Sequence, residues 1–328
     1  MQHRIQSLPL LVALVSVTLL VFCIALAVGS VSLPLHSVIA ALTGGSDPLT
    51  RTLVLELRLP RALTAFAVGG LLALAGALMQ VLLRNPLADP YILGVSGGAA
   101  VGALGSLLAG VGGYWISGSA FAGALISMLI VFVLAHGRGG WTPTRLLLTG
   151  IVVAFGWGAL ISFMLVLSDD ASLRGMLFWL MGDLSYRGNG WLPLVVLGLG
   201  LLAWLPFARH LNVLARGETL AEALGIAVRP FSIAIYISAS LFTAIAVTEA
   251  GAIGFVGLVI PHILRLVSGS DHRSLLPGAA LAGGSLLMLA DTLARSVAAP
   301  QQLPVGVITA AIGVPLFLYL LNRARGPL

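Results

Sequence analysis

The chain contains no lysine, a single cysteine and few charges of any kind. All 17 basic residues among its 328 are arginine, and charged residues make up only 9% of the sequence. A nucleotide-binding P-loop requires a lysine, so this chain cannot hydrolyse ATP through such a loop, and Schiff-base catalysis is excluded for the same reason. The lone Cys23 excludes an intrachain disulfide, a cysteine-based zinc site and an iron–sulfur cluster.

The scarcity of charge also excludes a soluble globular enzyme. Soluble domains carry roughly 25% charged residues, whereas this chain is 59% apolar and has a mean hydropathy of +1.08. Such a chain has too little polar surface to cover a water-facing globule, so lipid must be its solvent. Its 40 glycines indicate membrane helices whose backbones approach closely.

The hydropathy pattern predicts an all-α polytopic membrane protein with about ten transmembrane helices. Each apolar run is matched against the roughly 20 residues that cross a bilayer. The expected spans are 8–29, 61–82, 92–110, 114–136, 145–167, 191–207, 230–249, 255–269, 275–294 and 305–322. The eighth is short and contains Pro261, so we expect a short or broken helix there. The first is longer than the apolar part of a signal peptide and is expected to stay as a membrane helix.

The distribution of arginine predicts the orientation of the chain. With the N-terminus inside, six arginines fall outside: Arg51, Arg58, Arg61, Arg174, Arg187 and Arg295. The remaining arginines, including Arg4, Arg138 and Arg325, fall on the inner side. Positive charge is retained in cytoplasmic loops. This excess, with an even number of spans, favours two cytoplasmic termini.

The outer arginines require an explanation of their own. Arg58 and Arg61 flank Pro60 at the entrance of the second span, and two guanidiniums beside a rigid proline can present a fixed geometry to carboxylates. Anchoring at the membrane interface is the alternative. Arg295 is expected on the same side, where it could pair with Asp291 four residues earlier on a helix.

The longest inner connection, residues 209–229, predicts a contact with a partner. Residues 215–225 favour a short helix with Leu220 and Leu224 four apart, ended by Gly225. A short amphipathic helix on the cytoplasmic side suits docking into a groove of another protein. The alternative is a helix that lies on lipid headgroups.

Two further functions, an intramembrane protease and an ion-coupled transporter, each require particular residues at membrane depth. The Gly94-Val95-Ser96-Gly97 segment with His262 resembles the dyad of rhomboid-type intramembrane serine proteases, but both residues are expected near cytoplasmic ends. A secondary, ion-coupled transporter requires acids deep in the membrane, whereas Glu249 and Asp291 lie near span ends. No two histidines have the spacing of metal ligands on one helix, so no metal site is predicted. No catalytic residue is predicted either.

Several segments together resemble the permease subunits of the FecCD type, which belong to ABC importers for ferric siderophores, haem and cobalamin. They occur in the family's order between about residues 58 and 320. The matching stretches are residues 58–61 (RLPR), 85–90 (NPLADP) with 93–96, 254–258 with Pro261, His262 and Arg265, 271–273 (DHR), Asp291 with Arg295, and 303–306 (LPVG).

The resemblance implies a type II ABC importer permease fold, with residues 1–328 as one transmembrane permease domain. It implies a homodimer in the bacterial inner (plasma) membrane, with the substrate path along the dimer axis. The partners that it implies are two cytoplasmic ATP-binding subunits and a periplasmic substrate-binding protein. Such a permease is not itself an enzyme, needs no cofactor and binds no nucleic acid.

The resemblance also assigns roles to individual residues. Arg58, Arg61 and Arg295 would receive glutamates from the two lobes of the binding protein. The ATPase would dock on the loop 209–229, through Arg216, Gly217, Glu218, Leu220, Ala221, Leu224 and Gly225.

Two expectations concern the path and the cargo. Thr142 and Thr144 match the small hydroxyl residues of the inner gate, although Pro143 between them departs from the family pattern, and Arg174 is a candidate for a cargo carboxylate. Among iron siderophore, haem and cobalamin, an iron chelate is favoured only because it is the commonest cargo in the family.

Overall fold

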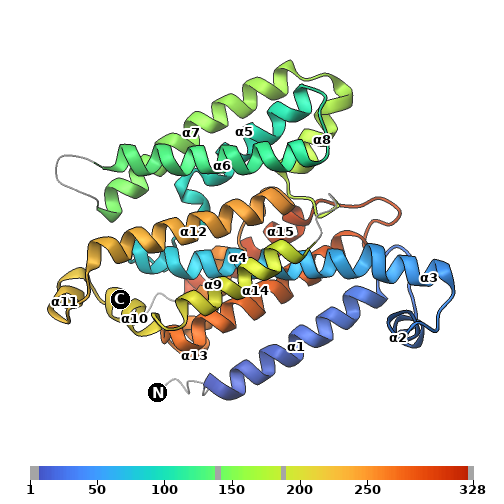
Figure 1. Ribbon diagram of the computed structural model, residues 1–328, viewed down its shortest axis with the longest axis horizontal. Coiled ribbons are helices and arrows are strands. Elements are labelled where there is room, and N and C mark those ends of the chain that lie inside the picture. Colours follow the sequence, from blue (N-terminus) through green and yellow to red (C-terminus); the bar gives the residue numbers. More distant parts are fainter. Residues whose placement is uncertain (1–6, 137–141, 186–189, 324–328) are drawn as a thin grey trace.

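The computed structural model describes residues 7–136, 142–185 and 190–323, and every regular element in that part of the chain is a helix (Figure 1). Each predicted span has a counterpart: α1 (Ser7–Ala27), α4 (Leu59–Leu82), α5 (Val95–Leu108), α6 (Tyr114–Ala135), α7 (Pro143–Leu167), α9 (Trp191–Trp204), α12 (Val228–Ala250), α13 (Val256–Ser268), α14 (His272–Ala294) and α15 (Val305–Arg323). Arg4, Arg138, Arg187 and Arg325, used above for the orientation, lie outside the described residues.

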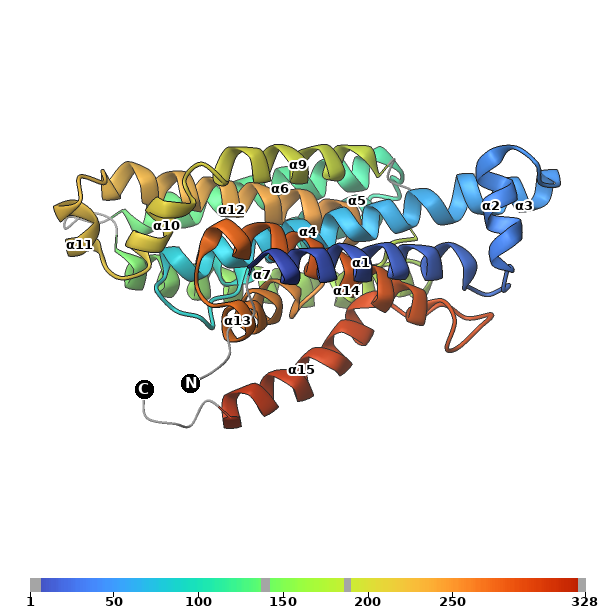
Figure 2. The same cartoon turned by 90° about the horizontal axis from the view of Figure 1, so that it is seen from below.

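Most of the short helices lie near the two ends of the bundle, whereas the one at residues 90–93 packs inside it against α7. They are α2 (Leu35–Thr43), α3 (Pro48–Thr52), η1 (Leu53–Arg58), η2 (Pro90–Leu93), α8 (Asp170–Leu180), α10 (Ala208–Leu214) and α11 (Glu218–Ala223). Figure 1 shows α2 and α3 at one end and α10 and α11 at the other, where α1 also begins. Figure 2 shows that α15 runs back toward this second end. The start of α1 and the end of α15 therefore lie on the same side as α10 and α11, as an even number of spans requires.

The spans differ in length. Six helical segments of the described chain are long and apolar enough to cross a membrane, and α9 with α10 form a further candidate bent by 70°. The helices α5, α13 and α15 are apolar but shorter. The prediction of a short eighth span is confirmed, since α13 has 13 residues; it continues through Pro261 without a break.

Helix α4 is the axis of the molecule. It continues α3 and η1, and 89% of its most apolar window is buried against α9, α12, α13 and α14. Glycine makes this packing possible, because a Cβ on Gly76 would lie 1.8 Å from the carbonyl oxygen of Gly257, and one on Gly69 would lie 2.3 Å from that of Gly283. Helices α13 and α14 thus touch the backbone of α4 directly, as in other membrane bundles with small residues at the contact.

Candidate docking and coupling sites

The first candidate site lies at the α2–α3 end, where Arg58, Arg61, Asp291 and Arg295 meet; we call these four residues the outer arginine cluster. The π-helix η1 leads into it, and the N–H of Leu59 bonds to the carbonyl of Val54, five residues back. Pro60 follows, and its ring is incompatible with the usual bond to the carbonyl four residues earlier. The widened turn places Arg58 beside α1 and Arg61 beside α14.

Two members of the cluster cap the C-terminus of α1. Arg58 donates to the carbonyls of Leu26 (2.7 Å) and Ala27 (2.9 Å) and also to that of Val31, while Arg295 donates to Ala25. The carbonyls of Ala25, Leu26 and Ala27 have no partner within α1 and carry its negative dipole end, which cations stabilise. Arg58 and Arg295 are 4% and 8% exposed. Both therefore contribute to the fold of the α2–α3 end.

Arg61 is held by a carboxylate of its own chain. Its Nε and Nη2 donate to Asp291 at 2.8–3.0 Å, and its Nη1 donates to Ser185 Oγ at 3.3 Å and to Gln302 Oε1 at 3.1 Å. Asp291 is 2% exposed and also lies 3.6 Å from Arg295 Nε. The expected pairing of Arg295 with Asp291 is confirmed, but the stronger partner of Asp291 is Arg61, 230 residues away in sequence.

The three predicted docking arginines are thus brought together but are unequal. The side chain of Arg61 is 16% exposed, whereas that of Arg295 is 9% exposed. With one carboxylate among three guanidiniums, the cluster keeps two net positive charges. Docking of a partner at this site stays a prediction. Because Arg58 and Arg295 are more deeply buried, Arg61 is the most accessible arginine of the cluster.

The second candidate site lies at the opposite end and consists of α10, α11 and the residues that join them to α12. We call residues 208–227 the coupling segment. Leu220 is 43% and Leu224 62% exposed, whereas Ala221 is fully buried. Gly225 adopts φ +79° and ends α11, with Ile226 N–H bonding to Ala221 and Gly225 N–H to Glu222. The predicted short helix and its glycine stop are confirmed, although the helix itself covers only Glu218–Ala223.

Two polar contacts anchor the coupling segment to the bundle. Asn212 Oδ1 accepts from the backbone N–H of His272 at 2.9 Å and lies 2.6 Å from His272 Nδ1, and Asn212 Nδ2 donates to Asp271 at 2.8 Å. On the other side, Arg84 pairs with Glu218 at 3.1 Å on the surface. Sequence reasoning missed Asn212, because a single asparagine in a polar loop carries no signal of a contact 60 residues away.

The connection between α4 and α5 has structural roles that explain its polar residues. Asn85 Oδ1 accepts from the N–H of Leu87 at 2.9 Å, and Asp89 Oδ1 accepts from that of Tyr91 at 2.8 Å. Burial raises the pKa of the Asp89 carboxyl to about 6. Nearby, Arg265 donates to Gln80, whose amide donates to the carbonyl of Leu258 at 3.2 Å and so ties α13 to α4.

The remaining predicted residues lie apart from both sites. Thr142 is the N-cap of α7 and accepts from the N–H of Arg145 at 3.3 Å, and Thr144 is exposed. Arg174 is exposed on α8, with its guanidinium 5.8 Å from the ring centroid of Phe178. The gate and cargo roles of these residues stay predictions.

Comparisons with known proteins identify the family of this chain. The FecCD transport family matches residues 17–323. The chain belongs to this family. It is 46% identical over 291 residues to the cobalamin import system permease protein BtuC of Halobacterium salinarum, covering 86% of this chain and 77% of that protein. It is 42% identical over 285 residues to the vitamin B12 import system permease protein BtuC of Escherichia coli O9:H4, covering 85% and 86%.

A solved structure supports the same assignment. It is described as an inward-facing conformation of a metal-chelate type ABC transporter and matches with a TM-score of 0.84 and 33% identity, over 95% of this chain and 98% of the other. This FecCD member is therefore a multi-pass ABC importer permease of the metal-chelate and cobalamin type. It is not an enzyme, because its relatives are permease subunits of ABC transporters, and the protease alternative is therefore wrong.

Proposed function

We propose that this protein is the permease subunit of an ATP-driven importer that carries cobalamin from the periplasm to the cytoplasm. The observation that carries the proposal is the pair of sites at opposite ends of α14. Asp271 and His272, at its start, contact the coupling segment, and Asp291, near its end, holds Arg61. A helix of 23 residues spans about 34 Å, so one element joins the two faces of the membrane.

The outer arginine cluster is the proposed contact with a periplasmic binding protein. Arg61 would make the direct contact through its exposed edge, while Arg58 and Arg295 fix the end of α1 behind it and add positive charge. A glutamate of the binding protein would compete with Asp291 for the same guanidinium, since both are carboxylates that bind in the plane of the fork. Docking should therefore weaken with salt.

The coupling segment is the proposed contact with two cytoplasmic ATP-binding subunits. Leu220 on α11 and Leu224 at its C-cap provide an exposed apolar pair. The permease has no lysine with which to bind nucleotide phosphates. In this orientation both termini lie in the cytoplasm and the chain sits in the inner membrane. The gate would be formed near Thr142 and Thr144, and Arg174 would face the outer mouth.

A homodimer is proposed because α7 exposes most of its apolar side chains. Only 6% of the most apolar 18-residue stretch of this helix is buried. Its large side chains, such as Val152 (70% exposed) and Phe155 (77% exposed), have few contacts with the rest of the chain. A second copy of α7 would cover them. In a background in which Cys23 is replaced, Val152→Cys should form a disulfide-linked dimer in membranes. Lipid-facing Leu129→Cys, 61% exposed on α6, is the control expected to stay monomeric.

Cobalamin is preferred to the iron chelate that family frequency alone suggests, because two relatives at 42–46% identity are named as cobalamin or vitamin B12 permeases. Proteoliposomes containing the permease, its ATPase and its binding protein should accumulate labelled cobalamin when ATP is supplied. Accumulation of a ferric siderophore or haem instead would overturn the cargo. Uptake that follows a proton or sodium gradient without ATP would favour the secondary transporter.

The docking role has its own test. Arg61→Glu should reduce the affinity for the binding protein and remove its salt dependence, and a Glu→Arg change on the binding protein should restore it. Arg51→Glu is the matched control, because Arg51 is an exposed outer arginine on α3 outside the cluster. Equal binding by both variants would assign Arg61 to membrane anchoring.

A further inference from the structure

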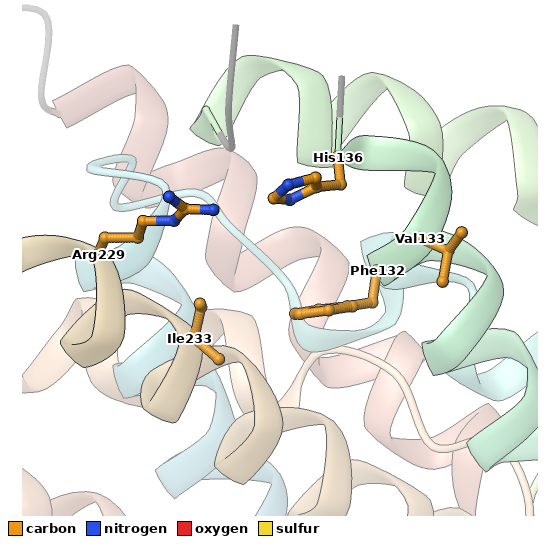
Figure 3. Close-up of a pocket in the computed structure, with 5 residues that line it drawn as sticks. All are labelled: Phe132, Val133, His136, Arg229 and Ile233. Carbon is orange, nitrogen blue, oxygen red and sulfur yellow. The ribbon is translucent and has the colours of Figure 1, made fainter. Parts of the chain in front are cut away.

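A cleft opens between the end of α6 and the start of α12, at the end of the bundle that carries α11. It encloses about 480 Å³ and is lined by Phe132, Val133, His136, Arg229 and Ile233. Figure 3 shows the guanidinium of Arg229 and the imidazole of His136 pointing toward each other across the mouth, with Phe132 and Ile233 below them. The cleft thus has a basic rim and an apolar floor.

The basic rim of the cleft has no acidic partner among the described residues. Among the described residues, no acidic side chain lines the cleft and no ion pair involves Arg229 or His136. Both side chains are exposed. Arg229 also lies in the first turn of α12, whose partial positive charge favours an anion. The rim is therefore suited to a phosphate group.

The two helices that form the floor also expose apolar side chains outside the cleft. On α6, Leu129 (61%) and Leu134 (64%) are exposed, and on α12 Ile237 is 43% exposed. Two apolar helix faces therefore lead away from a basic rim, which is the arrangement that accommodates an acyl chain below a headgroup. A soluble phosphate compound would make no use of these faces, whereas a phospholipid would fill both parts.

We propose that this cleft binds an anionic phospholipid, with its headgroup phosphate between Arg229 and His136 and an acyl chain along Phe132 and Ile233. Basic pockets between membrane helices at the cytoplasmic side are suited to such headgroups. The placement in the inner leaflet rests on the orientation given under Proposed function. Since Arg229 lies in the first turn of the helix that follows the coupling segment, a bound lipid would also restrict the motion of that segment.

Photolabelling of the purified full-length permease tests the site. The probes are phosphatidylglycerol and phosphatidylcholine with identical diazirine-bearing acyl chains, and labelled peptides are mapped. Phosphatidylglycerol should label residues 126–136 and 229–237 in preference to phosphatidylcholine. Arg229→Gln should lower this labelling about tenfold, the loss expected when one charge-assisted contact is removed. Arg273→Gln, at an exposed arginine of the same end, should leave it unchanged.

A second variant separates the apolar floor from the charge. Ile233→Trp fills the cleft and keeps both basic groups, and it should also abolish the labelling. Equal labelling by the two lipids, or by wild type and Arg229→Gln, would overturn the proposal. Displacement by excess glycerol 3-phosphate would reassign the cleft to soluble anions, and displacement by the ATPase subunit would reassign it to that protein. The permease is tested alone, so failure of the transport assay does not affect the result.

Discussion

The outer arginine cluster and the coupling segment lie at opposite ends of α14 and are held by different physical means. The cluster buries a carboxylate among three guanidiniums, and two of these also cap α1. The coupling segment keeps its leucines exposed and is attached by one asparagine and one surface ion pair. Buried charge makes the first end depend on each of its members, whereas the second end can change its surface without loss of the fold.

The largest effect is expected from removing the only carboxylate of the cluster. Asp291→Ala would leave three guanidiniums facing one another in a buried site, and breaking a buried ion pair costs about 3–5 kcal/mol. The thermal unfolding midpoint in detergent should fall sharply. Glu222→Ala, an exposed acid of the coupling segment, is the control. A midpoint equal to that of the control would show that the outer cluster does not stabilise the fold.

A smaller effect is expected at the partly buried anchor of the coupling segment. Asn212→Ala removes the acceptor of the His272 N–H and the donor to Asp271, which costs about 1–3 kcal/mol. Hydrogen exchange should accelerate in α10 and in the first turn of α14 and remain unchanged in α1. If exchange rose throughout the bundle, the contrast between the two ends would be lost.

The surface anchor should contribute less still. Arg84 and Glu218 are each about 40% exposed, and exposed pairs are worth about 0–1 kcal/mol and are screened by salt. Arg84→Gln should therefore change stability slightly at low salt and not at high salt. A loss of stability that persists in high salt would mean that Arg84 acts by packing.

The smallest effect on stability is expected where the functional effect should be large. Leu220→Asp with Leu224→Asp alters exposed side chains, and such changes usually stay within about 0.5 kcal/mol. The double variant should fold normally but fail to co-purify with the ATPase subunits and lose ATP-driven uptake. Thr219→Asp, on the same short helix and exposed, is the control for added charge. Normal co-purification of the double variant would favour a helix that lies on lipid headgroups.

Local signals in the sequence were sufficient for the spans and for the coupling helix. Helix α6 ends one residue before its predicted limit, and the stop at Gly225 was placed correctly, because hydropathy and glycine conformation act over a few residues. The presence of Arg58, Arg61 and Arg295 at one end also followed from the sequence. Their unequal burial did not, since it depends on carbonyls at the end of α1 that hydropathy cannot locate.

By itself, the sequence determined that this protein lies in lipid, that it carries no P-loop lysine, and that its ends differ in charge. These properties follow from residue type and from apolar runs about 20 residues long. Only the tertiary structure decided that Asp291 belongs chiefly to Arg61, that Asn212 holds the coupling segment, and that Arg229 and His136 face one cleft. Each of these contacts joins residues far apart in the chain, and close packing of helices around α4 brings them within reach.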